Sequence, residues 1–378
     1  MRERIPGLDL LRASAIAMVV LYHALPLLIL ARPISSFWWL EGGRLGVDLF
    51  FVLSGFLIGE IILNTGGRMA EPRILAGFWI GRWLRTLPSY YLFLGLNIPL
   101  QRIFFPWPFG SWLQLAPYLC FAQNLLGAMP TFFLESWSLC VEEWFYLTMP
   151  LLIWAGLRAG VGFHRGFAGV LILMLLVPPA LRWEAKGFVD SHRHIADAVV
   201  YRLDSIGWGI AAAFVQQTQK AAWRRSLGFL LAAGLALSAT CYYLYVARPD
   251  LDGTWFSRVL LPTLTSFGFA MLLPWAASVR SLGGGWGERS ISALARWSYS
   301  LYLVNIPASV LVFFLLERRL PRTYLSSMIA VAVYLIASVA SSAALWRLFE
   351  RPILRARAQV SLCREAMAAR LMGAQNSP

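Results

Sequence analysis

The stretch GLDLLRASAIAMVVLYHALP, residues 7–26, opens an apolar helix that is long enough to enter a membrane, yet it carries Arg12 and His23. Eleven residues at 100° each place these two side chains on nearly the same helix face, about 16 Å apart along the axis. An ionisable side chain inside a span is costly in hydrocarbon and marks a candidate functional site. The alternatives are an anchoring arginine paired with Asp9 and a histidine that hydrogen-bonds to a neighbouring helix.

The composition identifies a lipid bilayer as the main solvent of the chain. Of its 378 residues, 58% are hydrophobic and 14% are charged, whereas soluble domains carry about 25% charged residues. The net charge is +14, which on a membrane protein marks cytoplasmic loops rather than a nucleic-acid surface, so we expect no nucleic-acid partner. The four cysteines are scattered and fit small packing residues, so we predict no disulfide framework.

Apolar runs of about 20 residues, each able to cross roughly 30 Å of hydrocarbon, recur along the whole chain. They predict an all-α, polytopic membrane protein with about ten transmembrane helices. The first apolar helix lacks a small-residue cleavage site, so we expect no cleavable signal peptide. The predicted spans are residues 8–30, 43–63, 82–105, 134–156, 166–182, 198–216, 225–246, 256–279, 293–316 and 324–348.

The uncharged stretch 106–133 could form another span, although prolines and glycines interrupt it. An eleventh crossing would place the arginine-rich tail outside, against the positive-inside rule. We therefore predict ten spans, both termini cytoplasmic, and residues 106–133 as an outward-facing, membrane-associated loop. The chain is then one membrane domain, 1–378, with a basic cytoplasmic tail from about residue 349. The segment ERRLPR at 317–322 is an exception, since it falls outside despite its charge.

A second group of polar residues lies in ESWSLCVEEWFYLTMPLL, residues 135–152. Ser138 and Glu142 are four residues apart and share a helix face, whereas Glu143 is turned by about 100°. One glutamate should face the bundle and the other an interface or a water-filled cleft, unless it only stabilises a helix end. A buried carboxylate near His23 could orient the imidazole as a general base. A Ser138–His23–Glu142 triad is conceivable, but the sequence lacks a nucleophile elbow.

The third group is in FWIGRWLRTLPSYY, near the cytoplasmic start of the third span. Arg82 and Arg85 are three residues apart and therefore share one helix face close to the membrane surface. They could be an ordinary positive-inside pair. They could also hold a phosphate-rich ligand, because a guanidinium binds phosphate through two hydrogen bonds.

Weaker patterns occur elsewhere in the chain. Asp48 lies among small residues in GRLGVDLFFVLSGFLIGE, where close helix packing is the favoured interpretation. In YRLDSIGWG, Arg202 and Asp204 could form an ion pair that lines a cleft at the mouth of the sixth span. His192 and His194 resemble half of a metal site, but no third ligand is nearby, so we predict no metal.

Taken in order, these motifs resemble those of the acyltransferase-3 family of integral membrane acyltransferases. Any one motif is weak, but seven in the right order form a specific signature that runs over nearly the whole chain. The matching segments are GLDLLRASAIAMVVLYHA, GRLGVDLFFVLSGFLI, RWLRTLPSYY, SWSLCVEEWFYLTMPLL, YRLDSIGWG, ARWSYSLYLVNIP and FERP.

The resemblance implies a membrane O-acyltransferase that moves an acyl group from acyl-CoA, most simply acetyl-CoA, to a hydroxyl. The expected acceptor is a cell-surface polysaccharide, a lipopolysaccharide or other glycan, or a small natural product. The expected location is the bacterial cytoplasmic membrane. By motif match, the catalytic candidates are His23, Glu142 and Ser138. The candidates for binding acyl-CoA are Arg12, Arg82 and Arg85.

The sequence departs from the family at one position. Members commonly have a histidine after SYSLYL and one further residue, where this chain has Asn305, which leaves His23 as the expected base. We also expect no appended SGNH-type domain. In the expected mechanism the arginines hold the CoA phosphates, while His23 takes the proton of the acceptor hydroxyl and Glu142 orients the imidazole.

Two other classes of protein share some of these features. A transporter or flippase for a glycan or a lipid-linked intermediate would also have about ten spans and intramembrane charges, but the sequence shows no paired broken helices. A scaffold is a third reading, although buried Arg, His and Glu are costly in a passive role. A carrier would move substrate without consuming acyl-CoA. The sequence predicts no particular oligomeric state.

Overall fold

The structure is a computed structural model that describes residues 4–28, 37–104, 112–126, 132–185, 197–317, 319, 321 and 323–356. These described residues form helices and turns with no strand, which confirms the all-α prediction. The long helices are α1 (Pro6–Tyr22), α3 (Gly46–Thr65), α4 (Pro72–Phe104), α6 (Ser136–Arg158), α7 (Phe163–Glu184), α9 (Leu203–Thr218), α11 (Leu227–Ala247), α12 (Leu261–Ser278), α13 (Gly285–Glu317) and α14 (Tyr324–Leu345).

Short elements connect the long helices. The short α-helices are α2 (Leu25–Leu28), α5 (Ala116–Leu119) and α10 (Lys220–Arg225). Single π-helical turns precede α12, at Phe256–Leu260, and follow α14, at Trp346–Glu350. In the predicted loop 106–133, the described part holds only a 3-10 turn and α5. The basic tail beyond residue 356 and the pair His192 and His194 lie outside the described residues.

Each of the ten predicted spans overlaps one long helix, but the span number stays a prediction. The first span, 8–30, covers α1 and α2, and its last two residues lie outside the described residues. Six helical segments in the described part of the chain are long and apolar enough to cross a membrane, and these contain α3, α7, α11, α12, α13 and α14. The remaining four long helices are α1, α4, α6 and α9. All four carry charged residues, and α1 and α9 are 17 and 16 residues long. The structure therefore supports a multi-pass membrane protein.

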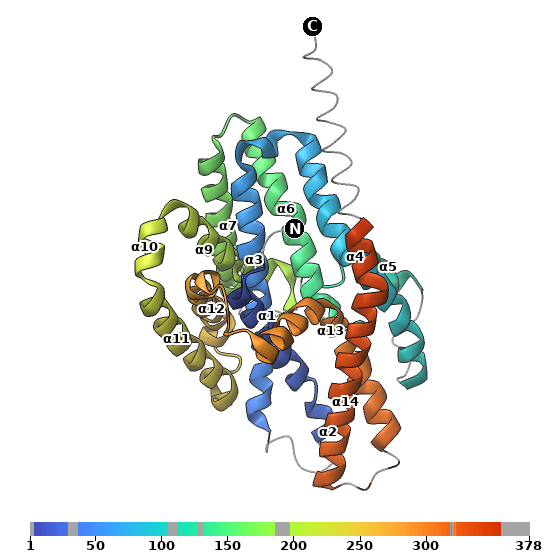
Figure 1. The fold of residues 1–378 in the computed structure, drawn as a ribbon. Helices are drawn as coiled ribbons and strands as arrows, with labels where there is room; N and C mark the ends of the chain where they lie inside the picture. Colours follow the sequence, from blue (N-terminus) through green and yellow to red (C-terminus); the bar gives the residue numbers. More distant parts are fainter. Residues whose placement is uncertain are drawn as a thin grey trace.

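Helix α1 lies in the middle of the molecule, with α3, α12 and α13 packed around it (Figure 1). Glycines allow these helices to approach closely, as the small residues in GRLGVDLFFVLSGFLIGE predicted. A Cβ atom on Gly55 of α3 would overlap the carbonyl oxygen of Ile206 in α9, and a Cβ atom on Gly209 would overlap that of Val52. The contact between α3 and α9 thus depends on backbone touching backbone.

Candidate active site

A narrow cavity lies between α1, α3, α4, α6 and α13, and most of the predicted site residues line it. Apolar side chains of α3 form one part of its wall, including those of Val47, Phe50 and Phe51. Polar groups of the other helices converge on the same space. The polar residues that line it are Arg12, Ser54, Arg82, Arg85, Thr86, Ser138, Glu142, Tyr146, Ser298, Tyr299 and Tyr302.

Three guanidinium groups from two helices face this cavity. Arg12 comes from the second turn of α1, and Arg82 and Arg85 come from neighbouring turns of α4. Arg82 also lies over the ring of Tyr146, 5.9 Å from its centroid. The alternative pair of Arg12 with Asp9 is not formed, and the Asp9 carboxylate instead lies 3.6 Å from the guanidinium of Arg4. Arg12 is thereby left to face the cavity.

Ser138 and Glu142 of α6 line the same cavity, as their four-residue spacing predicted. The Ser138 hydroxyl and the Tyr302 hydroxyl of α13 are 2.6 Å apart. The Glu142 carboxylate accepts hydrogen bonds from Ser54 at 2.8 Å and from Tyr146 at 2.9 Å. The cavity therefore presents two adjacent hydroxyl groups and one carboxylate opposite the arginines.

Glu143 points away from Glu142, as the helical rotation between neighbouring residues requires. Its carboxylate is buried and accepts a hydrogen bond of 2.6 Å from Thr86 of α4. Tyr299 donates a hydrogen bond of 2.7 Å to the Thr86 carbonyl. Glu143 thus joins α6 to α4, and Thr86 in turn joins α4 to α13.

His23 does not line this cavity, and the expected contact between His23 and Glu142 is not present among the described residues. His23 is the C-cap of α1, with its ring against Tyr22 and its Nδ1 atom buried without a partner in the described part of the chain. Asn305 lies beside the imidazole, so the position where the family commonly has a histidine adjoins His23.

The expected contact between Glu142 and the imidazole is not formed in this structure, where the two Glu142 oxygens accept hydrogen bonds from Ser54 and Tyr146. The Ser138–His23–Glu142 triad, which the sequence disfavoured, is not assembled either, since the Ser138 hydroxyl contacts Tyr302 and the Glu135 carbonyl. The relation between His23 and these residues depends on how α1, α6 and α13 cross, and residue spacing within one helix does not specify it.

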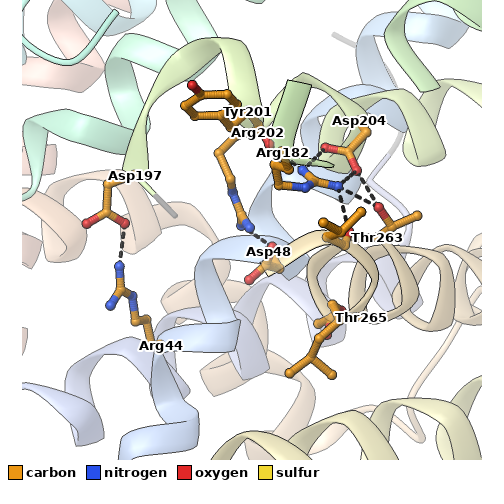
Figure 2. Close-up of polar contacts among 11 residues, drawn as sticks. Arg44, Asp48, Arg182, Asp197, Tyr201, Arg202, Asp204, Thr263 and Thr265 are labelled. Atoms are coloured by element: carbon orange, nitrogen blue, oxygen red, sulfur yellow. Dashed lines mark hydrogen bonds and ion pairs between the residues drawn. The ribbon is translucent and has the colours of Figure 1, made fainter. Parts of the chain in front are cut away.

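A network of ion pairs lies next to the cavity and differs from the predicted one (Figure 2). Arg202 binds Asp48 of α3, not Asp204. Asp204 instead binds Arg182 of α7 through two hydrogen bonds of 2.9 and 2.7 Å. The prediction paired the two residues nearest in sequence, but Arg202 caps α9 while Asp204 lies in its first turn, so the two side chains diverge. Arg44 forms a further pair, with Asp197.

The sequence reasoning missed Arg182, and the signal for it was present. It lies at the end of a predicted span, after two prolines, where any charged residue is a candidate for pairing. The side chain is 1% exposed and also binds the Tyr201 and Val259 carbonyls and the Thr263 hydroxyl. These contacts tie α7, α9 and α12 together, which makes the pair with Asp204 a structural one.

The terminal FERP motif also acquires a structural explanation. Glu350 is buried, and its carboxylate accepts hydrogen bonds from Ser300 of α13 at 2.7 Å and from Ser89 of α4 at 3.4 Å. It therefore fixes the π-helical turn after α14 to two helices that line the cavity. Within the described ranges, no three His, Cys, Asp or Glu side chains form a group that could hold a metal ion.

Comparison with known proteins identifies the family. The family described as "Acyltransferase domain" matches residues 5–347. Among curated proteins, the chain is similar to the peptidoglycan O-acetyltransferase OatA of Listeria monocytogenes, with 25% identity over 93% of this chain and 56% of that protein. It is also similar to the O-acetyltransferase OatA of Staphylococcus aureus, with 31% identity over 39% of this chain and 24% of that protein. The chain thus spans about half or less of the length of these relatives. No solved structure matches it.

Proposed function

This chain belongs to the acyltransferase-3 family, and we propose that it is a membrane O-acyltransferase that moves an acetyl group from acetyl-CoA to a hydroxyl of a cell-surface glycan. The observation that carries the proposal is the cavity in which Arg12, Arg82 and Arg85 face Ser138 and Glu142. The name of the Listeria monocytogenes relative supplies peptidoglycan as the first acceptor to test, and other polysaccharides, lipopolysaccharide and small hydroxylated natural products follow.

The three arginines would bind the donor. CoA carries several phosphate charges, and guanidinium groups bind phosphate through paired, charge-assisted hydrogen bonds. The cavity is only about 90 Å³ in volume, which suits the thioester end of the donor better than its nucleotide. The nucleotide would then lie at the mouth, beside Arg85, whose side chain is exposed.

The reaction joins the acceptor oxygen to the acetyl carbonyl carbon and breaks the carbon–sulfur bond of the thioester. The acceptor proton passes to a base and then to the departing CoA sulfur, so the products are an ester and free CoA thiol. The motif match assigns the base to His23, whose ring lines neither of the two described cavities and would have to approach the reacting groups on substrate binding. The Ser138 and Tyr302 hydroxyls are 2.6 Å apart, so one donates to the other, and the second would donate a hydrogen bond to the developing oxyanion. Glu142 would position the Ser54 and Tyr146 side chains in the donor site, because its carboxylate accepts a hydrogen bond from each of them.

The proposed topology has ten spans in the bacterial cytoplasmic membrane and both termini in the cytoplasm. The four helices outside the apolar set are α1, α4, α6 and α9. Helices α1, α4 and α6 bring the arginines, Ser138 and Glu142 to the cavity, and α9 carries the buried Asp204. Charged and polar side chains lower the mean hydropathy of a membrane span that carries them. The lower hydropathy of these four helices is therefore compatible with each of them crossing the membrane. With the N-terminus inside, Arg12 lies toward the cytoplasmic supply of acetyl-CoA.

The function is tested by measuring release of CoA thiol from acetyl-CoA by detergent-solubilised protein, with peptidoglycan fragments and a panel of hydroxylated compounds as acceptors. We expect release that depends on the acceptor and falls about 10²–10⁴-fold in His23→Ala, the range of general-base catalysis. Equal release by both proteins would remove His23 from the mechanism. Transport of labelled acceptor without CoA release would instead identify a carrier.

A further inference from the structure

A second cavity lies at the other end of α1 from Arg12. Tyr22, the last residue of α1, lines it, ten residues or about 15 Å beyond Arg12. Its volume is about 430 Å³, against about 90 Å³ for the first cavity. Only the second falls in the range of roughly 300–1,000 Å³ that is typical of small-ligand pockets. The ends of α1, α3, α9 and α11 contribute to its walls, together with the starts of α6 and α12.

The arginines of the second cavity are already matched by carboxylates. Arg44 pairs with Asp197, and Arg202 pairs with Asp48 (Figure 2). The third lining arginine, Arg248, binds an exposed aspartate at 2.7 Å. Unlike the first cavity, where three arginines face one carboxylate, this space has no excess of positive charge to attract the phosphates of CoA. The carboxylates of Glu41 and Asp252 also line this cavity, so its electrostatics disfavour an anionic ligand.

The ion pairs that line the second cavity retain hydrogen-bonding capacity. Asp48 accepts its bond from Arg202 through one oxygen only, so in the described part of the chain its second oxygen remains for a ligand. The Arg182–Asp204 pair differs, because two hydrogen bonds join its partners, both side chains are at most 1% exposed, and neither lines either of these two cavities. Arg202 and Asp48 can thus present both a donor and an acceptor to one ligand.

Aromatic side chains complete the lining. Tyr22, Trp137 and Tyr245 contribute ring surface beside the charged groups. Flat apolar surface next to paired donors and acceptors matches a sugar, whose ring has apolar faces and a rim of hydroxyl groups. We propose that the second cavity binds a neutral, polyhydroxylated carbohydrate as the acyl acceptor; this proposal rests on the proposed function. With a cytoplasmic N-terminus, this end of α1 opens to the outer side of the membrane.

The two cavities share one wall of side chains, so an acceptor in the second cavity would lie close to a donor in the first. Phe51 lines the first cavity and Trp137 the second, and their rings pack edge to face with centroids 5.8 Å apart. The Arg202 guanidinium lies over the Phe51 ring at 5.7 Å. Ser138, which lines the first cavity, directly follows Trp137 in α6. One layer of side chains therefore separates the carbohydrate site from the hydroxyl groups of the donor site.

The experiment introduces a thiol into the second cavity by Val246→Cys, in a protein whose Cys120 and Cys363 are replaced by serine. Val246 lines the cavity on α11. The matched control is Tyr243→Cys on the same helix, where the side chain is 57% exposed and lines neither cavity. Both variants are treated with a bulky maleimide, with and without chitotetraose as a neutral oligosaccharide probe. Acetyl-CoA binding by each variant reports folding.

We expect the maleimide to lower acceptor-dependent CoA release at least tenfold in Val246→Cys and less than twofold in Tyr243→Cys, with acetyl-CoA binding unchanged in both. Chitotetraose should slow labelling of Val246→Cys alone. Full turnover by labelled Val246→Cys, without protection by chitotetraose, would overturn the carbohydrate site and leave the proposed function intact. Protection without any turnover would support the carbohydrate site and count against the proposed function.

Discussion

Arg85→Ala should weaken the use of acetyl-CoA by an amount that the structure bounds. Arg85 lines the donor cavity on α4, and its exposed side chain contributes little to folding. A hydrogen bond to a charged group is worth about 1.5–3 kcal/mol, and 1.4 kcal/mol is a tenfold change in affinity. The KM for acetyl-CoA should therefore rise about 10- to 150-fold, with kcat nearly unchanged, because the phosphates do not take part in the chemical step.

The decisive comparison uses a donor without phosphates, S-acetyl-N-acetylcysteamine. Its KM should change less than twofold in Arg85→Ala, because it has no group for the guanidinium to bind. Arg73→Ala is the matched control, since Arg73 lies on the same helix, is exposed and lines neither cavity. Equal losses with both donors would refute the assignment of Arg85 to the CoA phosphates and would indicate a general distortion of the cavity.

Three further predictions concern packing and the ion pairs. Gly55→Ala should lower the free energy of unfolding by about 1–3 kcal/mol, whereas Gly95→Ala, where a Cβ atom meets nothing, should change it by less than about 1 kcal/mol; thermal unfolding in detergent separates them. Arg182→Met should cost about 3–5 kcal/mol by leaving Asp204 charged and unpaired, and Arg182→Met with Asp204→Leu should recover part of that loss; additive effects would contradict a direct coupling. Asp48→Asn should raise the KM for the carbohydrate acceptor about 10-fold or more while the KM for acetyl-CoA stays within twofold, and steady-state kinetics with each substrate varied would expose the opposite pattern.

Properties that depend on one helix at a time could be predicted from the sequence. The lengths of the apolar runs predicted ten spans, and each of these overlaps a long helix. The four-residue spacing of Ser138 and Glu142 predicted that they share one helix face, and both line the donor cavity. Side chains three apart in the same helix also share the donor cavity, as with Arg82 and Arg85. Each of these follows from the helical repeat, which is the same whatever surrounds the helix.

Partner choice between helices could not be predicted in the same way. Asp48 and Arg202 are 154 positions apart in the chain, and nothing in either segment distinguishes this pairing from one with Asp204. The crossing of α3 and α9, which Gly55 and Gly209 permit, brings the two residues together. The same limit applies to His23 and Glu142, whose helices are both at the site but present these side chains to different neighbours.

The surroundings of Ser138 argue for direct transfer rather than an acyl-serine intermediate. A nucleophilic serine needs a base within hydrogen-bonding reach to take its proton. In the described part of the chain, the Ser138 hydroxyl contacts the Tyr302 hydroxyl and a backbone carbonyl, and neither is a base of that kind. One of these two hydroxyls donates to the other, which leaves one proton of the pair to donate to a thioester oxygen. If the acceptor reaches the thioester past Phe51 and Trp137, the two substrates must be bound at the same time. Initial-rate kinetics should then give intersecting double-reciprocal lines, whereas parallel lines would indicate an acyl-enzyme and return Ser138 to the role of nucleophile.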